Sequence, residues 1–524
     1  MTAPPINLAG ILDAAVEVAP DRLALVFDDG SSTSYGQLGD EVRAWAATLD
    51  AAGVGPGGRV PLCDWGGVRS AAATLAAAHL GAATTQMNPL LTARELRELI
   101  EVSGSGPVGV AGPDAAQPHP PNRRRQRAPR RPLPTPFHLA EALGPDATLL
   151  REPSGPVTAD AAPPRVGQGD TAAVVLFTSG TTGRPKAIAL SHAALLDRIQ
   201  AYRQPPTAER PANVTLMCVP SFHVGGMLGL LVNLYGGDTT VIQPRFDAGG
   251  WLALVERHHV VTAFVVPAML ARILDHPDLA ATDTSSLRML SYGAAAAPVD
   301  LVRRAMEHWP DVGFANTFGQ TETIGAYTTL SPVDHRDPRR IGSVGRPLAG
   351  VEIRLVDPDT GVETAADASG DRVGEIWVRS AQVVAPDQPP DGWMRSGDLA
   401  RQDAHGYLYP LGRMSDTINR GGEKFPPSEI AERLRAHPAV ADVVVVGVPD
   451  DELGQRVGVA VVVRSGHPTP TRDELRDWCR SDLAGFKLPD VVVFVDALPV
   501  NELGKLPRAA AVELITGTAA DGPA

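Results

Sequence analysis

The chain has 524 residues, more than one ordinary domain requires, so at least two domains are expected. Hydrophobic residues make up 44% and charged residues 20%, which is close to ordinary globular composition and allows large cores to be buried. The net charge of −13 argues against a general nucleic-acid binder.

The cysteines and the first residues indicate the compartment. Cys63, Cys218 and Cys479 are too few and too scattered for a disulfide framework or a metal cluster. Residues 1–10 lack a basic segment and a long apolar run, and no stretch approaches the ~20 apolar residues of a membrane span. We therefore expect a cytoplasmic protein with no membrane span. The expected oligomeric state is a monomer or a homodimer.

The first part of the chain, residues 1 to about 110, has a mixed α/β pattern. Ala-rich stretches at 42–52 and 69–80 predict helices, and the apolar run 23–27 predicts a strand. Residues 112–136 are rich in Pro and Arg and cannot bury a core, so they predict a mobile surface loop.

From residue 171 the chain alternates between apolar runs of strand length and helical segments, which is typical of a parallel α/β sheet. The expected strands are residues 172–177, 214–219, 239–242, 262–266 and 288–291.

After residue 351 the pattern changes to short strands with turn residues, which predicts a small β subdomain. Residues 413–524 then read as a separate α+β domain. Its expected elements are helices at 428–436 and 472–483 and strands at 441–446, 457–463 and 491–494. The tail after Thr516 is small and polar and is expected to be disordered.

The segment LFTSGTTGRPK, residues 176–186, has the composition of a phosphate cradle. Glycines let backbone amides approach an anion, hydroxyls add donors, and the lysine supplies charge. It does not match the Walker pattern, because Lys186 is followed by Ala187 and by strand-like sequence. A surface loop is the alternative. The candidate nucleotide-binding residues here are Thr178, Ser179, Gly180, Thr181, Thr182 and Gly183, with Lys186 as a catalytic candidate.

This segment resembles the phosphate loop of the adenylate-forming superfamily, which includes acyl- and aryl-CoA synthetases, peptide-synthetase adenylation domains and luciferases. The resemblance continues in order and spacing from about residue 20 to residue 510, and it is nearest to the acyl-CoA synthetases.

The segment NTFGQTE, residues 316–322, resembles the family's aromatic-Gly-x-Thr-Glu motif. The resemblance implies that Glu322 contacts Mg²⁺, that Thr321 faces the α-phosphate and that Phe318 stacks on adenine. Phe318 replaces the usual Tyr. Asn316 and Thr317 are further nucleotide-binding candidates.

The segment WMRSGD, residues 393–398, resembles the family segment that ends in Gly-Asp. The implied role of Asp398 is to accept from the ribose hydroxyls. Gly412 and Arg413 resemble the start of the inter-domain hinge, and Arg413 would reach the ribose or a phosphate. Ser415 stands where the family has Lys or Asp, with Asp416 next to it.

Two C-terminal segments resemble loops that act in turn. One resembles the thioester-forming loop of the CoA and aryl-acid ligases, and it comprises Arg420, Gly421, Gly422, Glu423 and Lys424. The other, Leu503-Gly504-Lys505, resembles the catalytic-lysine loop, so Lys505 would stabilise the charge that develops during adenylation.

Two segments resemble the family's acid pocket. In SFHVGGM, residues 221–227, His223 would gate the pocket, and Val224 departs from the Asn of the aryl-acid branch. In SYGAAA, residues 291–296, small side chains leave room for a bulky hydrophobic acid. The candidate pocket residues are His223, Val224, Gly225, Met227, Tyr292, Gly293, Ala294 and Gly319, of which Gly293 and Ala294 would also contact the nucleotide.

The resemblance implies a large N-terminal α/β domain with parallel sheets and a small β subdomain, residues 1–412, and a small mobile α+β domain, residues 413–524. It implies a ligase that uses ATP, Mg²⁺ and CoA to convert a small-molecule carboxylic acid to its adenylate and then its thioester. Three alternatives stay open: a carrier-protein pantetheine as acceptor, catalysis of one half-reaction alone, and a non-catalytic binder.

Overall fold

The computed structural model describes residues 6–111, 137–153, 163–166, 169–179, 184–384, 391–498 and 508–520. The chain forms two compact units. Unit 1 comprises Met1–Ala294, Asp300–Tyr327 and Ser380–Gln388, and unit 2 comprises Ala295–Val299, Thr328–Arg379 and Pro389–Ala524. The Arg- and Pro-rich stretch at 112–136 lies outside the described residues. The domain boundary expected between residues 412 and 413 separates the large N-terminal domain from the C-terminal domain that is expected to move. This boundary stays a prediction.

Unit 1 contains two sheets whose strands are mostly parallel. In the first, six parallel strands are followed by one antiparallel edge strand, in the order β13 (Gly313–Gln320), β12 (Met289–Gly293), β11 (Thr262–Val265), β9 (Val214–Met217), β10 (Thr239–Ile242), β1 (Leu23–Phe27) and β2 (Ser32–Ser34). In the second, five parallel strands are followed by the antiparallel β8, in the order β6 (Thr148–Leu150), β5 (Val108–Ala111), β3 (Arg59–Cys63), β4 (Ala83–Met87), β7 (Ala172–Ser179) and β8 (Pro185–Ser191). These sheets confirm the parallel α/β prediction.

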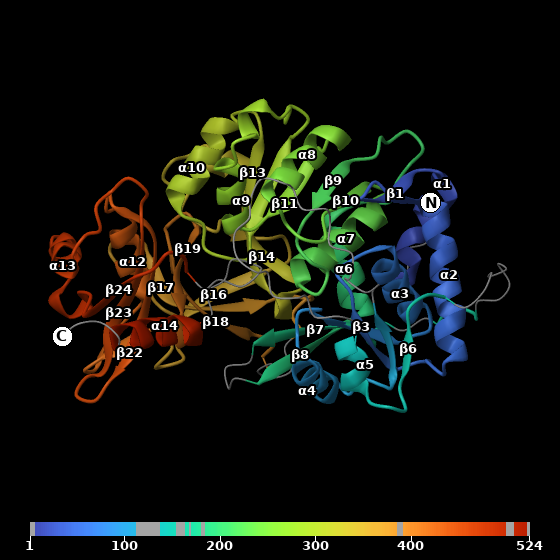
Figure 1. Cartoon of the computed structure of the whole chain (residues 1–524), viewed down its shortest axis with the longest axis horizontal. Coiled ribbons are helices and arrows are strands. Elements are labelled where there is room, and N and C mark those ends of the chain that lie inside the picture. The colour runs from blue at the N-terminus through green and yellow to red at the C-terminus, as the bar shows by residue number, and fades with distance from the viewer. Residues whose placement is uncertain are drawn as a thin grey trace. The chain divides into compact units, whose positions relative to one another are not determined.

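The helices and 3₁₀ turns of unit 1 connect and cover these strands. They are η1 (Leu8–Leu12), α1 (Asp13–Val18), α2 (Tyr35–Ala51), α3 (Val68–His79), α4 (Ala93–Ser103), α5 (Phe137–Leu143), α6 (His192–Tyr202), α7 (Val224–Gly236), α8 (Ala248–His258), α9 (Pro267–Leu274), η2 (Leu279–Ala281), α10 (Val299–His308) and η3 (Thr321–Thr323). Figure 1 shows α6 and α7 between β9–β10 and β3–β7, and one apolar core joins both sets of strands with these helices and with α2 and α3. Strands covered on both faces are continuously apolar, as β1 is and as β7 is from Ala172 to Phe177.

Unit 2 contains smaller, mainly antiparallel sheets. Strands β14 (Gly325–Leu330, which begins in unit 1) and β15 (Arg346–Pro347) pair antiparallel, with α11 (Pro332–His335) between them in the chain. They lead into a four-stranded sheet of β16 (Glu352–Val356), β17 (Arg372–Arg379), β18 (Met394–Gln402) and β19 (Leu408–Arg413). The C-terminal part contains η4 (Met414–Asp416), β20 (Ile418–Arg420), β21 (Glu423–Phe425), α12 (Pro427–Arg435), β22 (Val440–Asp450), β23 (Gly454–Val463), α13 (Arg472–Arg480), η5 (Gly485–Lys487), β24 (Val491–Phe494) and α14 (Arg508–Ala520). The predicted β subdomain and α+β segment are both confirmed.

Several element ends differ from the sequence predictions. Helix α2 begins at Tyr35 rather than at residue 42, because Ser34 and Gln37 form a capping box with hydrogen bonds of 3.2 and 2.9 Å. The expectation of a disordered tail after Thr516 was wrong for residues 517–520, because α14 continues to Ala520. Ala511 and Ile515 anchor that helix in an apolar cluster with Val446 and Val448 of β22. Within the described parts of the chain, no helix is both long and apolar enough to cross a membrane.

Candidate active site

The phosphate-loop segment folds as a β-hairpin arm. Strand β7 ends at Ser179, β8 starts at Pro185, and Thr178 lies opposite Lys186 in the antiparallel register. Gly180, Thr181, Thr182 and Gly183 lie outside the described residues. A strand therefore follows this loop, whereas a helix follows the loop of Walker-type nucleotide-binding proteins, so the hairpin agrees with the sequence-based distinction.

The carboxyl ends of two neighbouring parallel strands bring together four predicted residues. Tyr292 of β12 lies beside Asn316 of β13, and Gly293 lies beside Thr317. A Cβ on Gly293 would stand 2.2 Å from the Thr317 carbonyl oxygen, so this position accepts no side chain. Ligands of open α/β sheets bind at such carboxyl ends. The next residue, Ala294, has φ of 66°, a strained value for a residue other than glycine.

The segment after β13 forms a tight turn that presents Thr321 and Glu322. Both side chains are half-buried in η3, and the Glu322 carbonyl accepts from the Val384 N–H at 2.7 Å. The Thr323 hydroxyl donates to the Gly325 carbonyl at 2.7 Å, and Ile324 has φ of 50°. The turn is thus held in a backbone geometry that few side chains adopt freely.

Arg198 forms a hydrogen bond to the backbone of this turn, and the sequence analysis did not identify it as a site residue. It lies on α6, is 3% exposed, and donates from Nη2 to the Thr323 carbonyl at 2.9 Å. Burial lowers the pKa of Arg198. A buried arginine that satisfies a turn carbonyl is a strong anchor, because an unsatisfied buried carbonyl is costly. No periodicity or motif marks such a long-range contact.

Phe318 and Gly319 precede the turn, near the end of β13. The Phe318 ring is half-buried and meets the Tyr327 ring edge to face, with centroids 5.3 Å apart. A Cβ on Gly319 would stand 2.0 Å from the Gly325 carbonyl oxygen. Gly319 therefore allows the close chain approach that shapes the turn.

The chemistry of the donor set fits Mg²⁺ held mainly by phosphates. Among the described residues, no group of three or more His, Cys, Asp or Glu side chains is close enough to form a metal cage. Mg²⁺ is commonly bound by one or two carboxylates together with substrate phosphates. Glu322 could supply such a carboxylate.

The candidate acid-pocket segment starts α7. His223 is the N-cap residue of the helix, and its ring lies 4.7 Å from the Phe222 ring. His223 and Val224 are half-buried, Gly225 is exposed and Met227 is buried. The Trp65 ring meets Phe222 edge to face at 6.1 Å, and the Arg245 guanidinium lies 4.6 Å from the Trp65 centroid. Trp65 and Arg245 are neighbours of this segment that the sequence analysis missed.

A cavity beside this segment is too small for the acid. It encloses about 20 Å³, close to the space of one water molecule. Its lining residues are Trp65, Gly66, Met217, Val219, Pro220, Ser221, Leu230, Ile242, Gln243 and Pro244. Neither His223 nor Gly293 lines it, so it is not the predicted acid pocket.

In unit 2, the candidate ribose-binding carboxylate is tied to its neighbouring strand. Asp398 of β18 lies opposite Arg413 of β19, and Arg413 Nε contacts Asp398 Oδ1 at 2.9 Å. Asp398 is 8% exposed, and its N–H donates to the Ser396 hydroxyl at 3.0 Å. The structure thus pairs the two residues to which the sequence assigned ribose contacts.

Glu375 of β17 fixes the bulged part of β18 just before Asp398, and the sequence analysis did not identify it. It is 2% exposed and accepts from Trp377 Nε1 at 2.9 Å, from Arg395 at 2.9 Å and from the Gly397 N–H at 3.2 Å. A buried carboxylate with several donors is held in one position.

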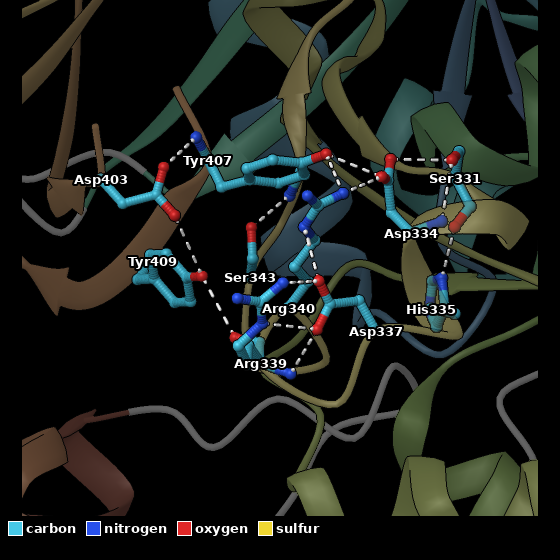
Figure 2. A network of polar contacts seen from close by, with 11 residues as sticks. Ser331, Asp334, His335, Asp337, Arg339, Arg340, Ser343, Asp403, Tyr407 and Tyr409 are labelled. Atoms are coloured by element: carbon cyan, nitrogen blue, oxygen red, sulfur yellow. Dashed lines mark hydrogen bonds and ion pairs between the residues drawn. The ribbon is translucent and has the colours of Figure 1, made fainter. Parts of the chain in front are cut away.

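A polar network positions β19 (Figure 2). The Asp334 carboxylate accepts from Ser331 at 2.8 Å, Tyr407 at 2.6 Å and Arg340 at 2.7 Å. Although burial raises the pKa of Asp334, these hydrogen bonds outweigh it and hold the pKa below its usual range. The Ser343 hydroxyl also donates to the Leu408 carbonyl, so the segment after α11 is fastened to the strand that ends at Arg413.

The candidate thioester loop is the turn of the β20–β21 hairpin. Gly421, Gly422, Glu423 and Lys424 are exposed, whereas Arg420 is half-buried and paired with Asp490 at 3.0 Å. Lys424 Nζ lies 3.3 Å from Asp359 Oδ1. Lys505, the candidate adenylation lysine, lies outside the described residues.

Known proteins with similar sequences and structures cover nearly the whole chain. Residues 12–385 match the family model described as AMP-binding enzyme, and residues 429–505 match the AMP-binding enzyme C-terminal domain. The chain is 32% identical to a feruloyl-CoA synthase of Amycolatopsis sp, over 91% of this chain and 93% of that protein. It is 30% identical to the fatty acid–[acyl-carrier-protein] ligase ScoC of Streptomyces coeruleorubidus, over 92% of each chain.

A solved structure agrees with these sequence matches. The o-succinylbenzoate coenzyme A synthetase of Bacillus subtilis, solved in complex with ATP and a magnesium ion, is similar with a TM-score of 0.77 at 26% identity. The match covers 95% of this chain and 98% of that one.

Proposed function

The chain belongs to the AMP-binding enzyme family, and we propose that it activates an aromatic or other bulky hydrophobic carboxylic acid and transfers the acyl group to CoA. It is an ATP-dependent, AMP-forming ligase that uses ATP with Mg²⁺. The acid, the CoA acceptor and the residue roles below are the proposal. The cytoplasmic location and the monomeric or homodimeric state stay predictions.

One observation carries the choice of acid. Small or absent side chains occupy the carboxyl end of β12 and the start of α7, at Gly293, Ala294 and Gly225. At Gly225 a Cβ would meet nothing nearer than the Phe264 ring at 3.7 Å, so room remains beside this part of the proposed acid pocket, and apolar surface removed from water favours binding by about 25 cal/mol per Å². Two similar proteins, named for feruloyl and o-succinylbenzoate, act on aromatic acids, which supports the same class here.

In the proposed first step, the acid carboxylate attacks the α-phosphorus of ATP and pyrophosphate leaves. Lys186 and the β7–β8 loop would hold the phosphates, and Thr321 would donate to the α-phosphate. Mg²⁺, contacted by Glu322, would neutralise phosphate charge. Lys505 would stabilise the negative charge that grows between carboxylate and phosphate.

In the proposed second step, the thiol of CoA attacks the acyl carbon and AMP leaves. The C-terminal residues 413–524 would turn, withdrawing Lys505 and presenting Gly421 and Gly422 to the pantetheine arm. Asp398 and Arg413 would keep the ribose in place during both steps. One nucleotide site would thus serve two reactions in sequence.

The matching carrier-protein ligase makes a protein-bound pantetheine the second candidate acceptor. An enzyme that catalyses one half-reaction alone is the further alternative. The candidate residues Lys186, Glu322, Asp398 and Lys505 are all present, which argues against a binder.

The deciding experiment measures pyrophosphate release with acetate, hexanoate, decanoate, benzoate, ferulate and a polycyclic acid. Each acid is tested alone, with CoA and with a pantetheinylated carrier protein. We expect the highest kcat/KM with an aromatic or polycyclic acid and thioester formation with CoA. A best kcat/KM for acetate would contradict the proposed acid, and product formed solely with the carrier protein would contradict CoA as acceptor.

A further inference from the structure

The turn between β20 and β21 has a backbone that is unusual in two consecutive residues. Gly421 has φ of 60° and Gly422 has φ of 96°. The hairpin pairs Ile418 with Phe425 and Arg420 with Glu423, so the two glycines form its tip. Glycine has more conformational freedom than any other residue, so such a tip needs outside contacts to keep one shape.

Backbone contacts with the rest of the C-terminal segment supply part of this constraint. The Gly421 N–H donates to the Leu453 carbonyl at 2.8 Å, and the Gly422 N–H donates to Asn419 Oδ1 at 3.1 Å. The Asn419 N–H in turn donates to Gln455 Oε1 at 2.8 Å. The amides of Asn419, Gly421 and Gly422 are therefore fixed by partners within the same segment of the chain.

Arg420 supplies the side-chain constraint. Its side chain is 19% exposed, Nη1 donates to the Phe486 carbonyl at 3.0 Å, and Nη2 donates to Asp490 Oδ1 at 3.0 Å. The guanidinium thus points into the domain, away from the exposed glycines that follow it.

Asp490 is the centre of these contacts. Its side chain is 13% exposed, its second carboxylate oxygen accepts from the Val457 N–H at 3.1 Å, and its own N–H donates to the Val457 carbonyl at 2.8 Å. Arg476 of α13 lies 3.4 Å from Oδ1, the oxygen that Arg420 also contacts. The carboxylate joins the Gly-Gly hairpin to β23 and α13, 70 residues from Arg420 in the chain.

We propose that Asp490 is a positioning residue for thioester formation, acting through Arg420 to hold the Gly421–Gly422 turn in the shape that admits a pantetheine thiol. This inference rests on the proposed function. A segment that swings to the site must deliver its loop as a rigid body, because a displacement of about 1 Å can cost about 100-fold in rate. Charge-assisted hydrogen bonds to a half-buried guanidinium provide that rigidity.

The test replaces Asp490 by Asn, which keeps the side-chain volume and an oxygen for the Val457 N–H but removes the charge facing Arg420. With synthetic acyl-AMP and CoA, we expect kcat for thioester formation to fall by about 10- to 100-fold. ATP–pyrophosphate exchange should stay within about twofold of the wild type, because the turn has no proposed part in adenylation. An equal fall in both half-reactions would mean a general structural role and would overturn the proposal.

Asp482→Asn is the matched control. Asp482 forms an ion pair with Arg433 of α12 at 2.8 Å in the same C-terminal segment and accepts from the Ser481 hydroxyl, so its charge is paired away from the turn. It should leave both half-reactions unchanged. If Asp490 acts through Arg420, the double variant Asp490→Asn with Arg420→Met should form the thioester no more slowly than the slower of the two single variants. If the losses in rate of the two single variants add in the double variant, Asp490 does not act through Arg420.

Hydrogen exchange provides a readout that needs no substrate. In Asp490→Asn, amides 419–423 should exchange faster than in the wild type and in Asp482→Asn, because the Arg420 anchor is weakened. Unchanged exchange would overturn the inference even if the enzyme were inactive on every acid. A wild type that exchanges pyrophosphate but makes no thioester would instead contradict the proposed function.

Discussion

At the residue scale, the glycines of the candidate acid pocket differ in whether they can be replaced. A Cβ on Gly293 or on Gly226 would stand 2.2 Å from a backbone carbonyl oxygen, so any side chain there would displace the main chain. A Cβ on Gly225 meets nothing nearer than the Phe264 ring at 3.7 Å, which is an ordinary contact. A substitution that narrows the pocket without disturbing the fold must therefore be made at Gly225.

Gly225→Leu is expected to shift the enzyme towards shorter acids. The added side chain occupies space proposed for the acid, and each methylene that can no longer be buried costs about 0.8 kcal/mol. The ratio of kcat/KM for decanoate or ferulate to that for hexanoate should fall by about tenfold or more. The control is Gly229→Ala, one turn further along α7, where a Cβ meets Met217 at 3.8 Å. An unchanged ratio would place the acid elsewhere.

Lys505→Ala tests a role that rests on sequence resemblance alone, because Lys505 lies outside the described residues. ATP–pyrophosphate exchange should fall by about 100- to 1000-fold. Conversion of synthetic acyl-AMP and CoA to thioester should continue, since the lysine is proposed to leave the site before that step. Exchange at the wild-type rate would contradict the assignment.

At the element scale, the η3 turn depends on a helix far away in the sequence. Its backbone is bent by Gly319 and Ile324, and Arg198 of α6 holds the Thr323 carbonyl. Thr321 and Glu322, the proposed contacts of ATP and Mg²⁺, lie in this turn, so its rigidity should matter for MgATP rather than for CoA.

Arg198→Met should raise KM for MgATP and lower the free energy of unfolding. The substitution leaves the Thr323 carbonyl buried without its donor, which costs about 1–3 kcal/mol. Chemical denaturation and ATP–pyrophosphate exchange measure the two effects. Arg257→Met, on the exposed end of α8, should change neither. A loss of stability with an unchanged KM would mean that the turn does not position the nucleotide.

The elements with a clear period or motif could be predicted from the sequence. Strands β1, β10 and β24 were predicted with their observed ends, because each is a short run of apolar or β-branched residues. The start of α2 was missed because the Ser34–Gln37 capping box lies ahead of its Ala-rich part. Contacts of Arg198, Glu375 and Asp490 could not be predicted, because each joins segments distant in sequence and no local pattern marks them.

At the scale of the whole molecule, the net charge of −13 and the buried ionisable groups make stability depend on pH. His192 is one such group. It is fully buried at the start of α6, where Nδ1 accepts from the Leu8 N–H at 3.0 Å. Burial lowers the pKa of His192 from 6.5 to about 4. The neutral ring thus fastens the N-terminal η1 segment to the core of unit 1, which contains Leu8.

The direction of the pH effect follows from where the proton binds. Between pH 6.5 and about 4 the unfolded chain protonates this histidine and the folded protein does not, so acidification favours unfolding. At 1.36 kcal/mol per pKa unit, His192 alone should remove up to about 3 kcal/mol of stability across that window. Urea unfolding of the wild type at pH 7.5 and pH 4.5 should show this loss, together with losses from other groups.

His192→Asn isolates the contribution, because its side-chain oxygen can still accept from the Leu8 N–H but does not titrate. Between the two pH values, the free energy of unfolding of the variant should fall by about 2–3 kcal/mol less than that of the wild type. His308→Asn, on the exposed end of α10, should lose as much as the wild type. If both variants lose the same amount, the acid sensitivity of unit 1 arises from other groups, and the N-terminal segment is not fastened through a neutral His192.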